Sequence, residues 1–420
     1  MLYYLFDYFE KLGLPGAGVF QYISFRAGLA FVLSLLFGII FGKRTIKYMK
    51  SKQIIGEIRV KDIDKNSELF RQMEKKGTPT MGGIIIVIAI LLSTLLLADL
   101  TNIYIILMII TTVWLAFFGF IDDYLKIKHK NNKAGLSAKM KLICQIFIGV
   151  IVGGILYLSP DVVVRYKTND IDNKYEIASA SKTVSNDSIS YTDIKTTKTT
   201  IPFFKNNEFD YSSLLWFLGD KAEKYGWIIF ILATIFIVTA VSNGSNLTDG
   251  LDGLNVGVAA IVGVALGILA YVSGNAIAAN YLNILWLPNT GELTVFIASF
   301  IGAAIAFLWF NCFPAQIFMG DVGSLTIGGI IAVIAIIIKK ELLLPILCGV
   351  YLVETLSVII QKGYFKYSIK KYGEKRKYFL KAPIHHHFQM KNMFETKIAV
   401  RFWIISILLA VISIITLKLR

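Results

Sequence analysis

The chain has 420 residues, of which 55 % are hydrophobic and 17 % charged, and a formal net charge of +15. This apolar content excludes an ordinary water-soluble globular protein. The three cysteines, at positions 144, 312 and 348, lie far apart within or beside apolar stretches, which argues against a disulfide framework or a cysteine metal cluster.

Ten apolar segments follow one another along the chain, each near the roughly 20 residues that a membrane-spanning helix needs. They cover approximately residues 20–41, 81–98, 103–121, 142–158, 225–242, 254–272, 293–310, 322–338, 342–360 and 402–417. Their continuous hydrophobicity differs from the alternating pattern of an outer-membrane barrel. The sequence therefore predicts an all-α polytopic integral membrane protein. The N-terminus lacks a basic start and a cleavage site, so we expect no removable signal peptide.

The connections between these segments differ sharply in charge. Residues 42–80, 122–141 and 361–401 carry 11, 6 and 11 lysines and arginines, whereas residues 99–102 and 273–292 carry none. The positive-inside rule then places the odd-numbered connections in the cytoplasm and both termini outside. Basic residues confined to a few loops favour anionic lipids and anionic substrates as partners, and no nucleic acid.

A long polar stretch, residues 159–224, separates two transmembrane parts, residues 1–158 and 225–420. It carries nine basic residues on the predicted outer side, which the rule tolerates because long loops translocate largely regardless of charge. Its runs RYKT, KYEIAS and TTKTTIPFF predict short strands or flexible chain. We expect an extracytoplasmic insert without reactive chemistry.

Reactive side chains gather in the odd-numbered connections, which predicts one site on one face. In GFIDDYLK, Asp122 and Asp123 end the third segment, and Lys126 follows one turn later. Carboxylates at a helix C-terminus oppose the helix dipole, so they cost stability unless a ligand such as a cation compensates. A solvated helix end is the alternative interpretation.

A second acidic motif is NCFPAQIFMGDVGSL, in which Asn311 and Asp321 flank a turn at Pro314. Asp321 opens the eighth segment, where a simple helix N-cap is the alternative role. Carboxylates from two separate connections instead favour Mg²⁺ bridging substrate phosphates, since Mg²⁺ prefers one or two carboxylates plus phosphate and water.

The connection VSNGSNLTDGLDGLN, between the fifth and sixth segments, is too polar for a mere hairpin between membrane helices. Its polar side chains can read a base edge or sugar hydroxyls, and its glycines let the backbone approach a ligand. These side chains are Asn243, Asn246, Asp249 and Asp252. The alternative is that the segment is only a turn.

Two further motifs are basic. APIHHHF contains His385, His386 and His387, whose side chains point in different directions and so form a poor tetrahedral zinc site. Phosphate binding, proton transfer or hydrogen bonding suit them better, with an exposed interfacial tract as the alternative. KKGTPTMGG places Lys75 and Lys76 before a helix start, where phosphate can bind, although lysine is also common at membrane borders.

Together, six motifs resemble the phospho-N-acetylmuramoyl-pentapeptide transferases, bacterial enzymes of the polyprenyl-phosphate N-acetylhexosamine-1-phosphate transferase superfamily. The motifs are KGTPTMGG, FGFIDDYLK, SNGSNLTDGLDGLN, NCFPAQIFMGDVGSL, APIHHHFQ and ETKIAVRFWIIS, and the resemblance covers residues 20–158 and 225–420. It implies an inner-membrane enzyme that transfers phospho-N-acetylmuramoyl-pentapeptide from its UDP conjugate to undecaprenyl phosphate. The products would be UMP and lipid I, an intermediate of peptidoglycan biosynthesis. The resemblance also implies Mg²⁺ dependence and a cytoplasmic active site, and it leaves open whether the chain forms a homodimer.

The same resemblance implies roles for single residues. Asp321 is the expected direct Mg²⁺ ligand, with Asp122, the candidate base, and Asp123 close to the metal or acting on the lipid phosphate. The three histidines are expected to contact a substrate phosphate or sugar, and Phe318 to stack on uracil. The other expected substrate-binding residues are Lys76, Lys126, Asn243, Asn246, Asp249, Asp252 and Asn311.

Two other functions remain to be weighed. A sister transferase that takes N-acetylglucosamine-1-phosphate shares the membrane core and paired aspartates, but the APIHHHF run argues against it. A transporter or channel would line a path through the bilayer with intramembrane charges. Arg26 and Glu354 are the clear mid-span charges, and the other acidic residues gather on one face, which favours an enzyme.

Overall fold

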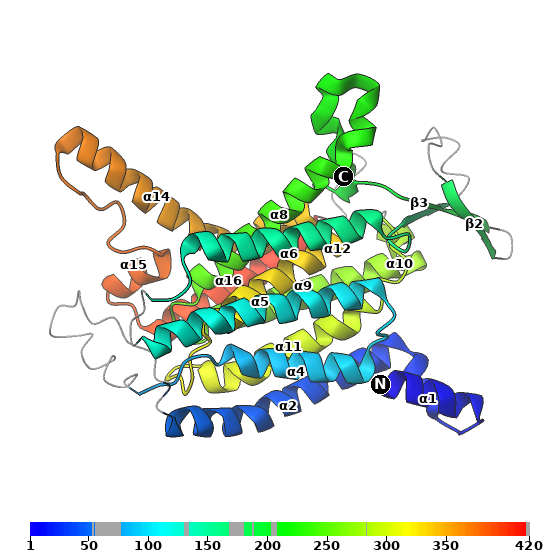
Figure 1. Cartoon of the computed structure of the whole chain (residues 1–420), viewed down its shortest axis with the longest axis horizontal. Coiled ribbons are helices and arrows are strands. Elements are labelled where there is room, and N and C mark those ends of the chain that lie inside the picture. The colour runs from blue at the N-terminus through cyan, green and yellow to red at the C-terminus, as the bar shows by residue number, and fades with distance from the viewer. Residues whose placement is uncertain are drawn as a thin grey trace.

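The structure, a computed structural model, describes residues 1–52, 54, 77–129, 134–167, 180–186, 189–202, 208–282 and 284–416. Its centre is a bundle of helices (Figure 1). Within these residues, eight helices have the length and hydropathy to cross a membrane. They are α2 (Ile23–Ser51), α5 (Ile103–Lys128), α6 (Ala138–Leu158), α8 (Ala222–Thr248), α9 (Leu254–Gly274), α11 (Leu293–Asn311), α12 (Gly320–Ile337) and α16 (Glu395–Ile415). The prediction of an all-α polytopic membrane protein is confirmed.

The two remaining predicted segments are also helical but differ in form. The second segment is α4 (Gly83–Leu97), which has only 15 residues. The ninth is a pair of helices, α13 (Leu344–Leu347), which follows a 3-10 turn (Glu341–Leu343), and α14 (Gly349–Tyr372), with a bend of 76° at the break between them. α14 continues to Tyr372, past the predicted end at residue 360. The prediction ended too early because the last turns of α14 are basic and aromatic, and a hydropathy pattern does not detect such a helix. It ends at Gly373, which adopts the left-handed conformation typical of helix C-termini.

The connections segregate to the two ends of the bundle, as alternating spans predict. At one end, the backbone N–H of Gly82 donates to the carbonyl of Phe318 at 2.8 Å, joining the first and seventh connections. At the other end, Asn102 Nδ2 donates to the carbonyl of Asn289 at 3.0 Å, joining the second and sixth connections. Figure 1 shows α15 (Ile384–Met390) near the first end and β2, β3 and the N-terminus at the second.

The polar stretch forms two small antiparallel sheets at the second end. One has the strand order β1-β3-β2 and the other pairs β4 with β5. The strands are β1 (Val164–Lys167), β2 (Ala180–Asn186), β3 (Ile189–Ile194), β4 (Lys198–Thr200) and β5 (Glu208–Asp210). Strands at RYKT and in TTKTTIPFF are therefore confirmed, whereas KYEIAS lies outside the described residues. The stretch is anchored to the bundle by Arg165 N–H, which donates to the carbonyl of Trp286 at 3.0 Å.

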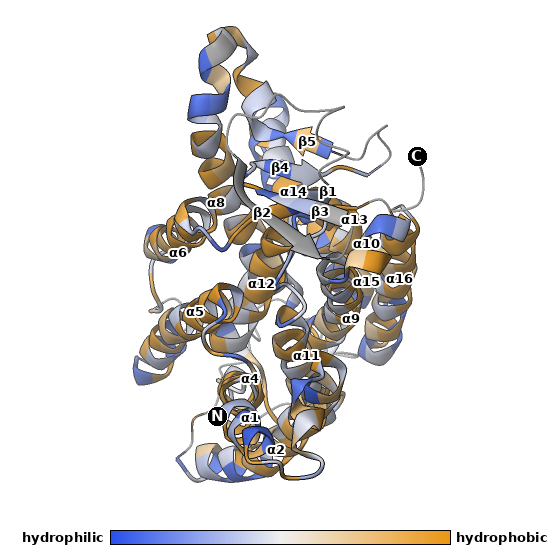
Figure 2. Ribbon diagram, turned by 90° about the vertical axis from the view of Figure 1, so that its right-hand side faces the viewer, coloured by the Kyte–Doolittle hydropathy of each residue, from blue (hydrophilic) through white to orange (hydrophobic). Residues whose placement is uncertain are grey.

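α12 lies at the centre of the bundle. In its apolar stretch 89 % of the residues are buried, against 22 % in α2 and 33 % in α16. Large apolar side chains nevertheless stay exposed on other helices, among them Phe236 of α8 and Trp309 of α11. Hydrophobic colour accordingly predominates on the bundle helices in Figure 2. Such extensive exposed apolar surface fits a protein whose surrounding solvent is lipid.

Four short helices complete the described structure. α1 (Leu2–Lys11) packs beside the end of α4, where the N-terminal amine donates to the carbonyl of Leu95 at 2.7 Å. The other three are the 3-10 helices Ala17–Gln21 and Tyr211–Lys221 and the α-helix α10 (Ala276–Leu282).

Candidate active site

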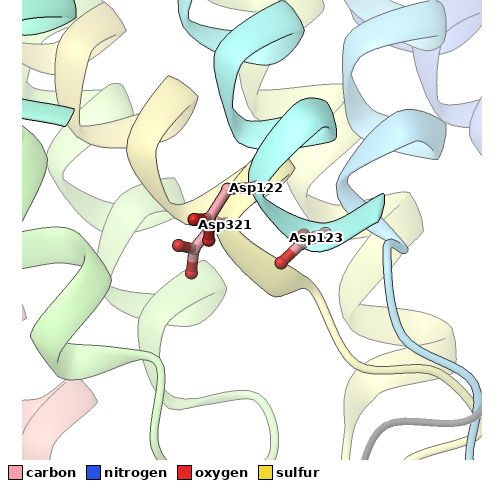
Figure 3. Close-up of side chains that lie close together, drawn as sticks. All are labelled: Asp122, Asp123 and Asp321. Carbon is pink, nitrogen blue, oxygen red and sulfur yellow. The ribbon is translucent and has the colours of Figure 1, made fainter. Parts of the chain in front are cut away.

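Three aspartates meet where α5 ends and α12 begins (Figure 3). Asp122 and Asp123 are buried in the last turns of α5, and Asp321 lies in the first turn of α12. One carboxylate oxygen from each lies within 4.8 Å of the others, and no further group of three His, Cys, Asp or Glu side chains comes this close in the described part of the chain. The predicted convergence of the two acidic motifs is confirmed.

Small residues allow the three helices to approach closely here. A Cβ on Gly119 of α5 would lie 2.5 Å from the backbone oxygen of Asp321, and a Cβ on Gly83 of α4 would overlap the backbone of Gly323 in α12. Glycine at such positions lets membrane helices pack backbone against backbone. The start of α12, and with it Asp321, is therefore held between α4 and α5.

Two lysines surround the carboxylates. Lys126 Nζ lies 2.5 Å from Asp122, 3.3 Å from Asp123 and 3.1 Å from Asp321. Lys141, in the first turn of α6, contacts Asp122 at 2.8 Å and also pairs with Asp321. Three carboxylates thus face two ammonium groups, which leaves negative charge for a further cation to balance.

Lys141 is a site residue that the sequence reasoning missed. It is one of six basic residues in its connection, and no motif distinguishes it from the others. The available signal was Ser137, whose side chain caps α6 by accepting from the N–H of Met140 and so places residue 141 in the first turn.

Hydrogen bonds orient each carboxylate. Asp122 accepts from the N–H of Leu136 at 2.6 Å, and Asp123 accepts from the N–H of Val322 at 3.2 Å. Asp321 accepts from Asn246 Nδ2 at 3.0 Å. Asn246 belongs to the SNGSNLTDGLDGLN motif; the sequence predicts a connection there, but the structure continues α8 to Thr248 and so puts Asn246 in the last turns of that helix. The structure thus brings a third predicted motif into the same site.

The acidic residues of that connection add negative charge. Asp249 follows the last residue of α8. Burial, and after it the carboxylates of Asp321, Asp123 and Asp252, raise the pKa of Asp249 to about 8. Neighbouring carboxylates disfavour a further negative charge, so the raised pKa shows a region of negative potential that would attract a cation.

Two predicted site residues contact loop backbone. Asn311 accepts from the N–H of Gly253 at 3.0 Å and donates to the carbonyl of Ile317 at 2.9 Å. Asp252 accepts from the N–H of Ala315 at 3.1 Å. Both therefore tie the connection between α8 and α9 to the connection between α11 and α12.

Three further predicted residues lie around this centre. Asn243 donates to Gln145 Oε1 and to the carbonyl of Thr239, each at 2.8 Å, one turn before Asn246. Phe318 has a half-buried side chain, and its N–H donates to the carbonyl of Pro79 at 2.8 Å. Lys75 and Lys76 lie outside the described residues.

The histidines of α15 have different surroundings, which confirms that they point in different directions. His385 is fully buried, and its Nδ1 lies 3.0 Å from Glu354 Oε2. His386 Nδ1 lies 2.6 Å from Gln389 Oε1, and His387 Nδ1 accepts from the N–H of Leu380 at 3.1 Å. Burial, followed by the charge of Lys391, lowers the pKa of His387.

Known proteins match this chain along its whole length. A family model for glycosyl transferase family 4 matches residues 105–339, and phospho-N-acetylmuramoyl-pentapeptide-transferase signature 1 matches residues 75–87. Proteins with that transferase name from Flavobacterium psychrophilum, Flavobacterium johnsoniae and Parabacteroides distasonis are 55 %, 54 % and 53 % identical to it, over 100 % of each chain. The chain belongs to the phospho-N-acetylmuramoyl-pentapeptide-transferase family.

The family match coincides with the site. The glycosyl transferase model runs from the start of α5 through α12 and so contains all three aspartates and both lysines. The transferase signature ends in α4, at the segment that packs against the start of α12. The resemblance inferred from the six motifs is confirmed. The sister-transferase and transporter alternatives are accordingly set aside for this multi-pass membrane transferase.

Proposed function

We propose that this chain transfers phospho-N-acetylmuramoyl-pentapeptide from UDP-N-acetylmuramoyl-pentapeptide to undecaprenyl phosphate, giving lipid I and UMP for peptidoglycan biosynthesis. The observation that carries the proposal is the trio of Asp122, Asp123 and Asp321 beside Lys126 and Lys141, in a chain that belongs to the transferase family. Phosphoryl transfer depends mainly on positioning and charge neutralisation, which such a group of charges supplies.

The donor set fits Mg²⁺, because all three close ligand atoms are carboxylate oxygens. We assign Asp321 as the direct ligand, with Asp122 and Asp123 beside it. When bound, the ion would neutralise negative charge on the diphosphate. Asn246 holds one Asp321 oxygen in place.

The two lysines and Asp122 have separate roles in this proposal. Lys126 and Lys141 both contact Asp122, one of the carboxylates that would face the diphosphate. Their ammonium groups can therefore stabilise negative charge as it develops there. Asp122, fixed by the N–H of Leu136, is the candidate base. The acceptor phosphate is already an anion near neutral pH, so a base is needed only to take its last proton.

The reaction proposed is a direct displacement. An oxygen of undecaprenyl phosphate forms a bond to the phosphorus that carries the sugar. The bond from that phosphorus to the oxygen of the UMP phosphate breaks, and UMP leaves with the electron pair. A covalent aspartyl-phosphate trapped during turnover would contradict this scheme.

The remaining predicted residues are proposed to hold the donor. Asn243, Asn246, Asp249 and Asp252 would face the nucleotide, with Phe318 on uracil and Lys76 nearby. The three histidines would contact a substrate phosphate or sugar. In support, the end of α8 contacts Asp321, and the loop that follows it contacts the segment that contains Phe318.

We also propose that the site faces the cytoplasm of the inner membrane, with residues 159–224 and both termini outside. The support is charge: the connections at the site end carry most lysines and arginines. Labelling of single cysteines placed at residue 131 and at residue 187, in intact cells with a membrane-impermeant reagent, tests this. Only the second should react, and the reverse pattern would refute the orientation.

UMP release by the detergent-purified chain tests the activity. The assay supplies UDP-N-acetylmuramoyl-pentapeptide and undecaprenyl phosphate, with Mg²⁺ or with a chelator. Release that requires the lipid and is abolished by chelation is expected. Release from UDP-N-acetylglucosamine in place of this donor would contradict the proposal. UMP release that persists in the presence of the chelator would contradict the proposed dependence on Mg²⁺.

A further inference from the structure

One face of α14 packs against the last turns of α8. A Cβ on Gly244, near the end of α8, would lie 3.2 Å from Tyr351 Cβ and 3.3 Å from Thr355 Oγ1. Glu354 lies between these two positions on the same helix face, since residues three and four apart are neighbours on a helix. The first turns of α14 therefore lie beside the helix end that leads into the 249–253 loop, the five residues that join α8 to α9.

Glu354 reaches this loop through His385. Both side chains are fully buried, and His385 Nδ1 lies 3.0 Å from Glu354 Oε2. Within the described residues, Glu354 Oε1 and His385 Nε2 have no hydrogen-bond partner. Burying two polar side chains with half of their hydrogen-bonding capacity unused costs stability, so the pair calls for a functional explanation.

The unpaired edge of His385 lies against the loop itself. The ring atom Nε2 stands where a Cβ of residue 250 would be, so only glycine fits at that position. The imidazole therefore packs directly on the backbone of Gly250, between Asp249 and Asp252. This contact can fix the conformation of the loop only if the His385 ring is itself held in one orientation.

We propose that Glu354 is a positioning residue that fixes the imidazole of His385, which in turn sets the 249–253 loop for donor binding. The inference rests on the proposed function, in which Asp249 and Asp252 face the nucleotide. Glu354 acts here without touching substrate. Its loss should therefore weaken donor binding more than it slows the chemical step.

Steady-state UMP release by the full-length purified chain separates these effects. In Glu354→Ala, KM for UDP-N-acetylmuramoyl-pentapeptide should rise about tenfold, the effect of losing one buried hydrogen bond, while kcat changes much less. Glu354→Gln keeps an oxygen that accepts from Nδ1, so its KM should stay near the wild-type value. The stability control is Glu292→Gln, at the far end of the bundle, which should lower Tm and leave KM unchanged.

A second variant changes the loop itself instead of the residue that holds His385. Gly250→Ala places a methyl group where the ring of His385 lies, so KM should rise as in Glu354→Ala. Gly363→Ala is the matched control, because a Cβ there meets no atom within 4 Å, and its KM should equal that of the wild type.

Three outcomes would overturn the inference. The first is an unchanged KM in both Glu354→Ala and Gly250→Ala, and the second is a fall in kcat alone. The third is an equal rise of KM in Glu292→Gln, which would show general destabilisation. If the wild type itself released no UMP from this donor, the proposed function would fail instead, so the two failures are distinguishable.

Discussion

Buried charges occur at both ends of the bundle, but they are arranged in opposite ways. At the site end, three carboxylates of like charge are held together, and two lysines only partly compensate them. At the other end, Arg26 and Glu292 form a matched pair of opposite charges, and Arg26 Nη2 lies 2.8 Å from Glu292 Oε2. In a matched pair each charge neutralises the other, whereas a cluster of like charges needs a further group of opposite charge to be stable. Buried charge alone therefore does not mark a functional site, and the cluster of three like charges is the feature that distinguishes this one.

The largest expected effect is that of Asp321→Asn, which removes one member of the unbalanced cluster. We expect kcat for UMP release to fall about 10³-fold, the scale of losing a main electrostatic group. Tm should not fall, because two carboxylates would then face two lysines. A thermal melt and a turnover assay on the same preparation check both points, and a lowered Tm would place Asp321 among the matched, structural charges.

The opposite response is expected from Glu292→Gln at the other end. Arg26 would be left buried without its partner, which costs about 3 kcal/mol of stability. Tm in detergent should drop while kcat of the surviving folded enzyme stays at the wild-type level. A loss of kcat without a loss of Tm would show that the two ends are not functionally distinct.

A smaller effect on turnover is expected from Lys141→Met. Removing one of the two compensating ammonium groups should lower kcat about 10- to 100-fold, because negative charge on the phosphates would be less well stabilised. Lys139→Met, two residues earlier in the same turn with an exposed side chain, is the control and should retain full activity. Equal activity of the two variants would remove Lys141 from the site.

The smallest expected effect, taken over a single pH unit, concerns Lys340 at the insert end. Burial lowers the pKa of Lys340 to about 7, from 10.5 when exposed, and its Nζ donates to Thr200 Oγ1 at 2.6 Å. Between these two pH values the unfolded chain binds a proton that the folded chain does not, so stability should rise with pH by up to about 1.4 kcal/mol per unit. Tm measured across this window should rise less steeply in Lys340→Met than in the wild type. Parallel curves would show that Lys340 keeps its proton on folding.

The sequence predicted much of this arrangement because the hydropathy of each segment, and the alternation of connections between the two sides of the membrane, can be read directly along the chain. The positions of the spans, their common ends and the meeting of Asp122 with Asp321 all follow from counting apolar segments. What it could not predict depends on contacts between segments. The bend after Leu347 leaves no trace in hydropathy, and Lys141 resembles its basic neighbours.

Glu354 shows the same limit from another direction. It stood out as a mid-span charge, and His385 as part of a motif, but nothing in the sequence joined them, because the contact arises only when α14 and α15 fold back on each other. Asn311 and Asp252 were likewise recognised as polar residues near the site. Their hydrogen bonds to loop backbone became visible only in the structure.

The distance along the chain between the two halves of the aspartate cluster affects how the protein is made. Asp123 accepts from the N–H of Val322, 199 residues later. A ribosome therefore completes α5 and delivers it to the membrane long before α12 exists, and for that interval the paired carboxylates rely on water at the membrane edge for their solvation. In the middle of the helix the same carboxylates would be exposed to lipid during this interval, at a high cost in free energy. Their position at the end of α5 is therefore compatible with the order in which the helices are synthesised.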